Sequence, residues 1–467
     1  MKSTNLLFCL GILIFSFGNL NAQQLKYSKV NIQATSIDQL MRLKDQGIDF
    51  EHYHGNLEEG IEMYLSGTEL SILENSDVKY IVEIDDVATY VEQRNIKEMR
   101  RLRVQGTEKK AANFELGSMG GFYTYSEVLA QLDEMKTLFP NLITDKFSIG
   151  TSIEGRTIWA VKISDNPDTD ESASEAAVYY DALTHAREPA SMATTINFMF
   201  HLLENYGSDS EATYLINNRE IFVVPVVNPD GYVYNESTNP NGGGMWRKNR
   251  RNNSGSCEGV DINRNFDWMW SSNSGSSGNT CSESYRGTSA FSEPETQAIR
   301  DFATSINPPI AYTTHTFQGS YLMIDFSNGT QDYALPAEFS NDCLDDNEYI
   351  YGDADVLLGF ASGTTQYWMF DALGTIIWTP ELGETGFWPA PSEIIPLVEE
   401  HLKPFIYISW VAGAYADFQG FNILNNSQLR NGENLSFNVE VKNKGLSQAA
   451  QNVTVDVSSP YANIVPI

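Results

Sequence analysis

AVYYDALTHAREPASMA, residues 177–193, combines a fold signal and a site signal in one short stretch. Its mostly apolar start, Ala177–Leu183, predicts a buried strand, and Pro189 opens a segment with a helical pattern. His185 and Glu188 stand between the two elements. An imidazole and a carboxylate three residues apart at a strand end can converge on one cation, and zinc accepts nitrogen and oxygen ligands. The stretch therefore predicts a strand–helix unit with a candidate zinc site at its junction.

The His-x-x-Glu pattern alone has little specificity. Six histidines and 61 acidic residues in a chain of 467 give about one such pattern by chance. His201 and Glu204 have the same spacing inside the helical pattern NFMFHLLENY. There a polar edge on an amphipathic helix is the simpler interpretation. The decision between the two pairs depends on the rest of the chain.

Residues 1–22 have the features of a cleavable secretory signal. One basic residue, Lys2, precedes an apolar core from Leu6 to Phe17, and Leu20-Asn21-Ala22 ends the segment. No later apolar run approaches the length of a membrane-spanning helix. We therefore expect the mature protein to be soluble and secreted.

The cysteines and the charge agree with an extracellular protein. Cys9 leaves with the signal, and the other three predict one disulfide and one free thiol in an oxidising compartment. Cys257 and Cys281 flank a loop rich in Ser, Gly and Asn and are the expected pair, which leaves Cys343 free. The formal net charge of −31 and the pI near 4.4 argue against nucleic acid and anionic membranes as partners.

Composition and the spacing of apolar residues divide the chain into four parts after the signal. Residues 23–98 alternate short strand-like and helical patterns and suit a small β-α-β-β-α-β domain. Residues 99–117 form a basic linker. Residues 118–417 alternate apolar strands with helices, which predicts an α/β domain with a mixed, mostly parallel sheet covered on both faces. Residues 418–467 read as the start of a β-sandwich module or as a short accessory strand pair.

A catalytic zinc site needs a third protein ligand. His315 follows the strand-like run 310–314, as His185 follows its own strand. Functional sites form at such carboxyl ends in open α/β sheets. A lone histidine after a strand can also be structural, but together with His185 and Glu188 it is the best third ligand. Because this site is contained in one domain, we expect a monomer.

Two further kinds of residue suit hydrolysis at such a site. Glu381 follows the strand-like run 375–379 and is a candidate general base for a metal-activated water, or else an ordinary loop glutamate. The segments 245–250 and 261–266 supply cationic groups that can pair with carboxylates, including Arg247, Arg250 and Arg264, in an otherwise acidic chain. Guanidinium groups pair with carboxylates and stabilise developing oxyanions.

The combination resembles the funnelin zinc metallocarboxypeptidases, the family of carboxypeptidases A and B. The matching motifs are His185-Ala-Arg187-Glu188, Asn228-Pro-Asp-Gly-Tyr232, Trp246-Arg247-Lys248, Gly259-Val-Asp261-Ile-Asn263-Arg264-Asn265, Ser292-Glu-Pro-Glu-Thr296, His315 and Glu381-Leu-Gly-Glu-Thr-Gly386. They run in family order with family-like spacing from Gly120 to Asp417.

The resemblance implies a set of catalytic roles. His185, Glu188 and His315 are expected to bind one Zn²⁺, with Asp261 orienting His185. Glu381 is expected to act as the general base that takes a proton from zinc-bound water. The reaction implied is hydrolysis of the C-terminal peptide bond of peptides or proteins.

The resemblance also implies the residues that hold the substrate. Arg247 is expected to polarise the scissile carbonyl and stabilise the oxyanion. Asn263 and Arg264 are expected to bind the free terminal carboxylate, and Arg187 to line the approach. Gln366 falls at the base of the side-chain pocket, which leaves the preferred C-terminal residue open.

The same resemblance assigns the parts around the catalytic domain. Residues 23–98 match an inhibitory propeptide in size and pattern, with activation by cleavage near Arg100–Lys110. Cys257 and Cys281 fall where the animal enzymes have a disulfide. Two positions depart from the family: Gly359 stands where a substrate-capping tyrosine is expected, and Phe317 where a substrate-contacting tyrosine is usual.

Two other functions remain open from the sequence. One is a catalytically inactive carboxypeptidase-like binding module, although Glu381 and all three ligands are present. The other is a zinc amidohydrolase acting on acyl amino acids or cell-wall peptides. Under every alternative, the remaining histidines and Glu204 are expected to bind no metal; these histidines are His52, His54, His201 and His401.

Overall fold

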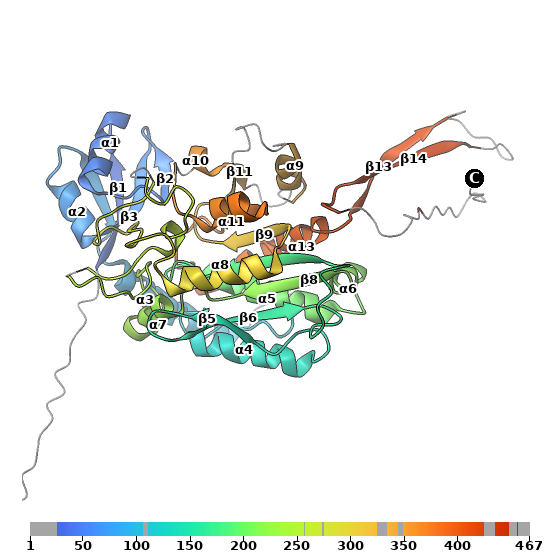
Figure 1. Ribbon diagram of the computed structural model, residues 1–467. Coiled ribbons are helices and arrows are strands. Elements are labelled where there is room, and N and C mark those ends of the chain that lie inside the picture. Colours follow the sequence, from blue (N-terminus) through green and yellow to red (C-terminus); the bar gives the residue numbers. More distant parts are fainter. Residues whose placement is uncertain are drawn as a thin grey trace, which may run out of the picture.

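A computed structural model describes most of the chain. The described residues are 26–105, 111–255, 257–272, 275–324, 334–343, 349–357, 359–424, 435–447 and 455. The expected signal at 1–22 and the side chain of Cys343 lie outside this description. Figure 1 shows a small N-terminal α+β unit against a larger α/β body, from which a narrow strand pair projects near the C-terminal end.

The N-terminal unit has the predicted β-α-β-β-α-β order. Its elements are β1 (Tyr27–Gln33), α1 (Ile37–Gln46), β2 (Tyr53–Asn56), β3 (Gly60–Ser66), α2 (Gly67–Glu74) and β4 (Lys79–Ile84). The strands form an antiparallel sheet in the order β2-β3-β1-β4. Alternate residues of β1, including Val30 and Ile32, point into a small apolar core of this unit. The Ser66–Glu69 capping box starts α2 immediately after β3.

Helix α3 (Val87–Gln105) connects this unit to the body. The Arg94 guanidinium donates to the Trp388 carbonyl at 2.7 Å, and the Asn95 amide donates to the Asn241 carbonyl at 2.9 Å. Part of the segment 99–117, which was expected to be a linker, belongs to this helix, because α3 continues to Gln105. Its residues 106–110 lie outside the described part of the chain.

The body is built on an eight-stranded mixed sheet in the order β11-β10-β12-β9-β7-β8-β6-β5. Its strands are β5 (Phe147–Thr151), β6 (Thr157–Ile163), β7 (Ala176–Ala182), β8 (Arg219–Val224), β9 (Ile310–Thr314), β10 (Ser320–Met323), β11 (Ile350–Asp353) and β12 (Ile376–Glu381). The central strands β12, β9, β7 and β8 pair in parallel, whereas β6, β5 and β10 join as antiparallel strands. This is the mixed, mostly parallel sheet that the sequence predicted.

Helices cover both faces of this sheet, as expected for strands that are apolar on both sides (Figure 1). They are α4 (Tyr125–Leu138), α5 (Pro189–Asn205), α6 (Ser210–Ile216), α7 (Pro229–Thr238), α8 (Pro294–Ile306), α9 (Ala334–Cys343), α10 (Ala354–Leu357), α11 (Thr365–Leu373), α12 (Pro391–Glu400) and α13 (Leu402–Val411), with a 3₁₀ turn η1 (Ile262–Arg264). Val178 and Tyr180 of β7 pack in the core that contains α4, α5, α12 and α13. Tyr179, between them, packs on the opposite face with α8 and α11.

Because β12, β9 and β7 pair in parallel, the residues that follow each of these strands lie at the same edge of the sheet. His315 follows β9 directly, and its N–H donates to the Pro380 carbonyl at 2.9 Å. In return the Leu382 N–H donates to the His315 carbonyl at 2.9 Å, so His315 lies beside Glu381 at the end of β12. The polar residues that follow β7 emerge at this same edge.

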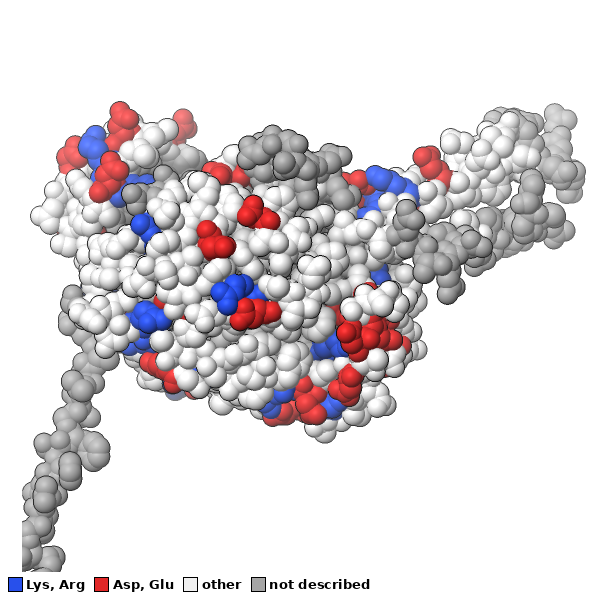
Figure 2. Space-filling view, viewed as in Figure 1, with Lys and Arg blue, Asp and Glu red and all other residues white. Residues whose placement is uncertain are grey.

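Beyond the body, β13 (Ala416–Ile423) and β14 (Phe437–Asn443) form a two-stranded antiparallel sheet. Of the segment 418–467, the described residues contain this strand pair and no further strand. No helix in the described part is long and apolar enough to cross a membrane. On the face seen in Figure 2, the described basic side chains lie singly or beside acidic ones.

Candidate active site

Three buried side chains meet at the carboxyl edge of the sheet. His185 Nδ1 lies 2.8 Å from Glu188 Oε1, and His315 Nδ1 lies 3.0 Å from Glu188 Oε2. The two imidazole nitrogens are 3.1 Å apart. His185, Glu188 and His315 are 3%, 0% and 1% exposed. The residues that the sequence singled out as ligands therefore converge, although 127 positions separate Glu188 from His315.

Local structure explains how each of these side chains is held. His185 follows β7 within the turn that leads to α5, and Glu188 is the N-cap residue of that helix. Pro189 at the first helical position suits the start of a helix because its missing N–H needs no acceptor there. The Ser191 hydroxyl donates to the Glu188 carbonyl at 2.7 Å and fixes the turn.

Asp261 and Arg247 support His185 from behind. His185 Nε2 lies 3.2 Å from Asp261 Oδ1, and Arg247 Nη2 donates to Asp261 Oδ2 at 2.8 Å. Burial alone would raise the pKa of Asp261, but Arg247 and His185 outweigh it and hold that pKa well below its usual value. The anionic Asp261 therefore accepts the Nε2 proton and leaves Nδ1 free to bind a cation.

Glu381 lies beside the triad with an unsatisfied oxygen. Its side chain is buried, and Oε2 has no hydrogen-bond partner among the described residues. Burial raises the pKa of Glu381 to about 8; Glu188 adds to the rise and His315 opposes it. A cation held by the triad would oppose this rise further, because positive charge favours the ionised carboxylate.

His185, Arg247 and Glu381 border one cavity of about 370 Å³ between the body and the N-terminal unit. The cavity is lined on the body side by His185, Arg247, Asn263, Arg264, Gln366 and Glu381, together with small and aromatic residues. The Asn263 side chain accepts the Thr365 N–H at 3.0 Å, which links η1 to the start of α11. The structure thus brings five of the six catalytic and substrate-binding candidates to one cavity.

Arg187 is the sixth candidate and lies elsewhere. Its guanidinium stacks 4.3 Å from the centre of the Phe387 ring and faces Glu283, with 3.5 Å between Nη1 and Oε2. It borders a smaller neighbouring cavity that it shares with Glu51 and His52. A role at the approach to the site therefore stays a prediction for Arg187.

Sequence reasoning missed Glu51 and His52 of the N-terminal unit. Glu51 Oε2 lies 2.7 Å from Arg247 Nη2, and Glu51 Oε1 pairs with Arg264. Burial opposes ionisation of Glu51, but the two guanidinium groups lower its pKa to about 2. His52 lies 4.0 Å from both Glu188 and Glu381. No local pattern marks these residues, because 213 positions separate Glu51 from Arg264.

Burial keeps His52 neutral by lowering its pKa to about 3. Among the described residues, the cluster of potential metal ligands around Glu188 does not include His52. Its ring stacks on Phe317 with 6.0 Å between ring centres and contacts Phe387 edge-on at 5.2 Å. Phe317, which departs from the family pattern, therefore contacts the N-terminal unit.

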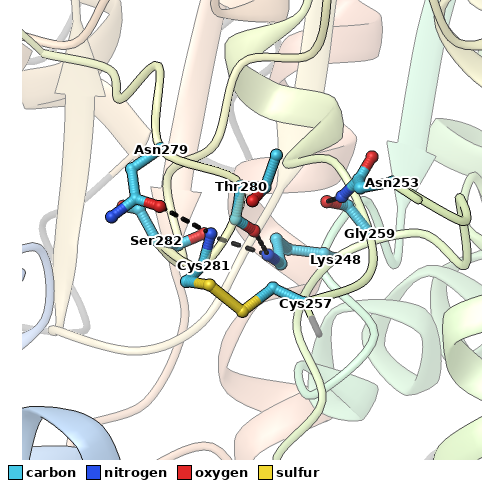
Figure 3. The surroundings of a disulfide bond; sticks show 8 residues. All are labelled: Lys248, Asn253, Cys257, Gly259, Asn279, Thr280, Cys281 and Ser282. Atoms are coloured by element: carbon cyan, nitrogen blue, oxygen red, sulfur yellow. Dashed lines mark hydrogen bonds between the residues drawn. A yellow bond between two sulfur atoms is a disulfide. The ribbon is translucent and has the colours of Figure 1, made fainter. Parts of the chain in front are cut away.

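A disulfide holds the loop that forms one wall of the cavity. Cys257 and Cys281 are bonded, as predicted, and Figure 3 shows Lys248 beside them. Lys248 Nζ donates to the carbonyls of Thr280 and Ser282 at 3.1 and 3.0 Å. Ser282 and other residues of this loop line the cavity. Gly359, on another wall, has φ +89 and open space where a side chain would begin.

The donor set fits zinc. Two imidazole nitrogens and a carboxylate, all buried, lie within 4.8 Å of one another, and catalytic zinc takes three such ligands while leaving one position open. The other acidic cluster found, Asp165, Glu171 and Glu175, contains no histidine and is less buried. Glu204 accepts the N–H groups of Ala112 and Asn113, each at 2.7 Å.

A buried His–Glu–His triad beside a carboxylate and a guanidinium, at the carboxyl edge of an α/β sheet, is typical of metal-dependent hydrolases. Similarity to known proteins identifies which family of metal-dependent hydrolases this is. The model of the zinc carboxypeptidase family, peptidase M14, matches residues 128–404.

Carboxypeptidase A2 of Mus musculus is 32% identical over 342 residues, which covers 70% of this chain and 77% of the mouse protein. Carboxypeptidase B of Bos taurus is 32% identical over 305 residues, covering 62% and 70%. The crystal structure of carboxypeptidase A from Helicoverpa armigera is similar with a TM-score of 0.67 at 25% identity, and covers 84% of this chain and 98% of that one. The chain therefore belongs to the zinc carboxypeptidase family, and it is a metallocarboxypeptidase whose His-x-x-Glu and distant His are intact.

Proposed function

We propose that this protein is a secreted zinc carboxypeptidase that removes the C-terminal residue from peptides or proteins. The observation that carries the proposal is the way Arg247 and Arg264 together hold the Glu51 carboxylate in the cavity that His185 of the triad also lines. Two guanidinium groups on one carboxylate form a recognition site for an anion of that shape. A free peptide C-terminus carries the same group.

Each residue then has a part in the reaction. Zinc held by His185, Glu188 and His315 would supply a Lewis acid and lower the pKa of a water molecule. Glu381 accepts the proton of the attacking water and passes it to the leaving amine. Arg247 stabilises the negative charge that develops on the scissile carbonyl oxygen.

The remaining groups bind the substrate and determine which of its peptide bonds is cut. Arg264 and Asn263 hold the terminal carboxylate, and this anchor sets the distance from the chain end to the bond that is cut. Gln366 borders the part of the cavity that takes the last side chain. Asp261 positions both His185 and Arg247 through its two carboxylate oxygens.

We further propose that residues 23–98 keep the uncleaved chain inactive. Glu51 sits in the carboxylate site and His52 lies between Glu188 and Glu381, so a substrate cannot enter while they remain. Cleavage within 99–110, where basic residues are concentrated, would free this unit. Export is supported by the signal-like residues 1–22 and the disulfide.

The proposal is tested with N-blocked peptides that differ in their last residue. The full chain is loaded with zinc and assayed before and after limited trypsin digestion, with and without a chelator. We expect release of single C-terminal residues after digestion, loss with chelator and recovery with added zinc. No release under any condition would indicate an inactive binding module. Cleavage restricted to acyl amino acids or cell-wall peptides would indicate an amidohydrolase instead.

A further inference from the structure

We propose that Gln366 makes this enzyme prefer substrates whose last residue is an uncharged carboxamide, glutamine or asparagine. The inference rests on the proposed function and adds to it the class of side chain that the cavity accepts. It follows from the hydrogen bonds of one buried amide and from the residues around it.

The orientation of the Gln366 amide is determined by its backbone neighbours. Gln366 is 4% exposed, and its Nε2 donates to the carbonyls of Leu322 at 2.8 Å and Ile377 at 3.3 Å. Both partners are acceptors only, so the amide cannot be turned around without facing oxygen against oxygen. The nitrogen therefore points to strands β10 and β12.

The oxygen of the same amide is left for the cavity. Gln366 Oε1 has no partner among the described residues, yet it is not among the fully enclosed unpaired atoms, so it keeps some accessible surface. Gln366 itself lines the cavity that contains Arg247, Arg264 and Glu381. A substrate side chain in this part of the cavity meets a hydrogen-bond acceptor.

Thr379 supplies a second polar group, on the strand next to Leu322. It is the register partner of Leu322, whose carbonyl binds Gln366, and it also lines the cavity. Its hydroxyl forms no hydrogen bond to the described residues and can donate to a substrate oxygen. An acceptor and a donor that line the same cavity match a carboxamide, which offers an N–H and a carbonyl.

Charged side chains are disfavoured in this part of the cavity. The body contributes three acidic or basic side chains other than His185 to the lining, Arg247, Arg264 and Glu381, and each has a part in the proposed reaction. Leu322, Thr379 and the other lining residues of the body carry no formal charge, and the charged residues Lys44, Asp49 and Glu51 belong to the N-terminal unit. A lysine or arginine side chain would therefore lose water without gaining a counter-ion, and a carboxylate would face Gln366 Oε1.

The test compares three N-blocked peptides that end in Gln, Glu and Met, which have side chains of similar length. The full chain, loaded with zinc and nicked by trypsin, is assayed for kcat/KM on each. We expect the Gln peptide to exceed the Met peptide by about tenfold, because one acceptor is left unpaired with Met. We expect it to exceed the Glu peptide by at least about a hundredfold.

The variant Gln366→Met should reverse the Gln-to-Met ratio, whereas Gln131→Met, on α4 and away from the cavity, should keep it. Thermal unfolding of both variants shows whether each is folded, and the comparison in the parent enzyme does not depend on either. Equal or better cleavage of the Met or Glu peptide by the parent enzyme would overturn the inference while leaving the proposed function intact. Cleavage of no peptide would overturn the proposed function and this inference with it.

Discussion

Glu381 and Arg247 are an acidic and a basic side chain that line one cavity, and their neighbours decide the charge that each carries. Arg247 is 1% exposed and is bound to Asp261 and Glu51, which together raise its pKa well above the usual value against the effect of burial. It therefore stays cationic at every working pH. Glu381 Oε2 has no hydrogen-bond partner among the described residues, and a cation held by the triad would favour the ionised form of this carboxylate.

The variant Glu381→Gln tests the role of this carboxylate. The amide keeps the shape of the side chain but cannot accept a proton. We expect kcat/KM to fall by about 10²–10⁴ with zinc still bound, because general-base catalysis contributes that much. Activity assays with metal analysis of the same sample check this. Full activity in the zinc-loaded variant would exclude Glu381 as the base.

At the scale of elements, the segment between α1 and β2 matters most for activity. Asp49, Glu51 and His52 line the cavity from the N-terminal unit, and α3 fastens this unit to the body through Arg94 and Asn95. In the ion pairs of Glu51 the arginine side chains are buried, 1% and 7% exposed, and the Glu51 side chain is 21% exposed. Breaking such a pair costs more than breaking an exposed one.

The variant Glu51→Gln should therefore make the uncleaved chain partly active. We expect its activity before digestion to rise at least about tenfold, because a buried hydrogen-bonded charge pair is lost. Glu58→Gln, on the exposed turn of the same unit, is the control and should change nothing. If uncleaved Glu51→Gln is as inactive as the parent and trypsin activates both equally, Glu51 does not hold the site closed.

The disulfide also acts at the scale of elements, because it fixes a loop. It joins residues 24 positions apart and closes the loop that forms one wall of the cavity. The double variant Cys257→Ser with Cys281→Ser should lose about 3 kcal/mol of stability, the value for a loop of this length. Denaturant unfolding measures this loss. Cys343→Ser is the control, because the sequence predicts no partner for Cys343, and an equal loss there would contradict that prediction.

At the scale of the whole molecule, buried carboxyl groups make stability depend on pH. Burial raises the pKa of Glu295 to about 7 from 4.5, although Ile153 N–H and the Asn249 amide donate to it. The folded chain then keeps a proton that the unfolded chain releases. The sign follows: this stabilisation is complete below pH 4.5 and is lost as the pH rises through 7.

Glu295→Gln should remove this dependence. We expect the free energy of unfolding of the parent to fall by about 3 kcal/mol more than that of the variant between pH 4.5 and 7. Urea unfolding across this pH range gives the difference. Glu134→Gln, on the exposed face of α4, should follow the parent. Parallel curves for parent and Glu295→Gln would show that Glu295 does not carry the effect.

Much of this protein is encoded locally. The strand and helix patterns are periodic in sequence, so the order of elements in the N-terminal unit and the α/β body followed from them. The convergence of the candidate ligands followed too, because polar residues directly after buried parallel strands lie at one sheet edge. His185 and His315 are of this kind.

Only the tertiary structure decided which distant groups share the cavity. It brought Glu51 to Arg247 and Arg264, turned the Gln366 oxygen inward, and put Arg187 against Phe387. The physical reason is that local patterns report which face of an element is buried, whereas these contacts depend on how segments distant in sequence pack against one another, and for Glu51 on how the N-terminal unit packs on the body. Their energies come from desolvated charges and fixed amides, which exist only once the two surfaces have met.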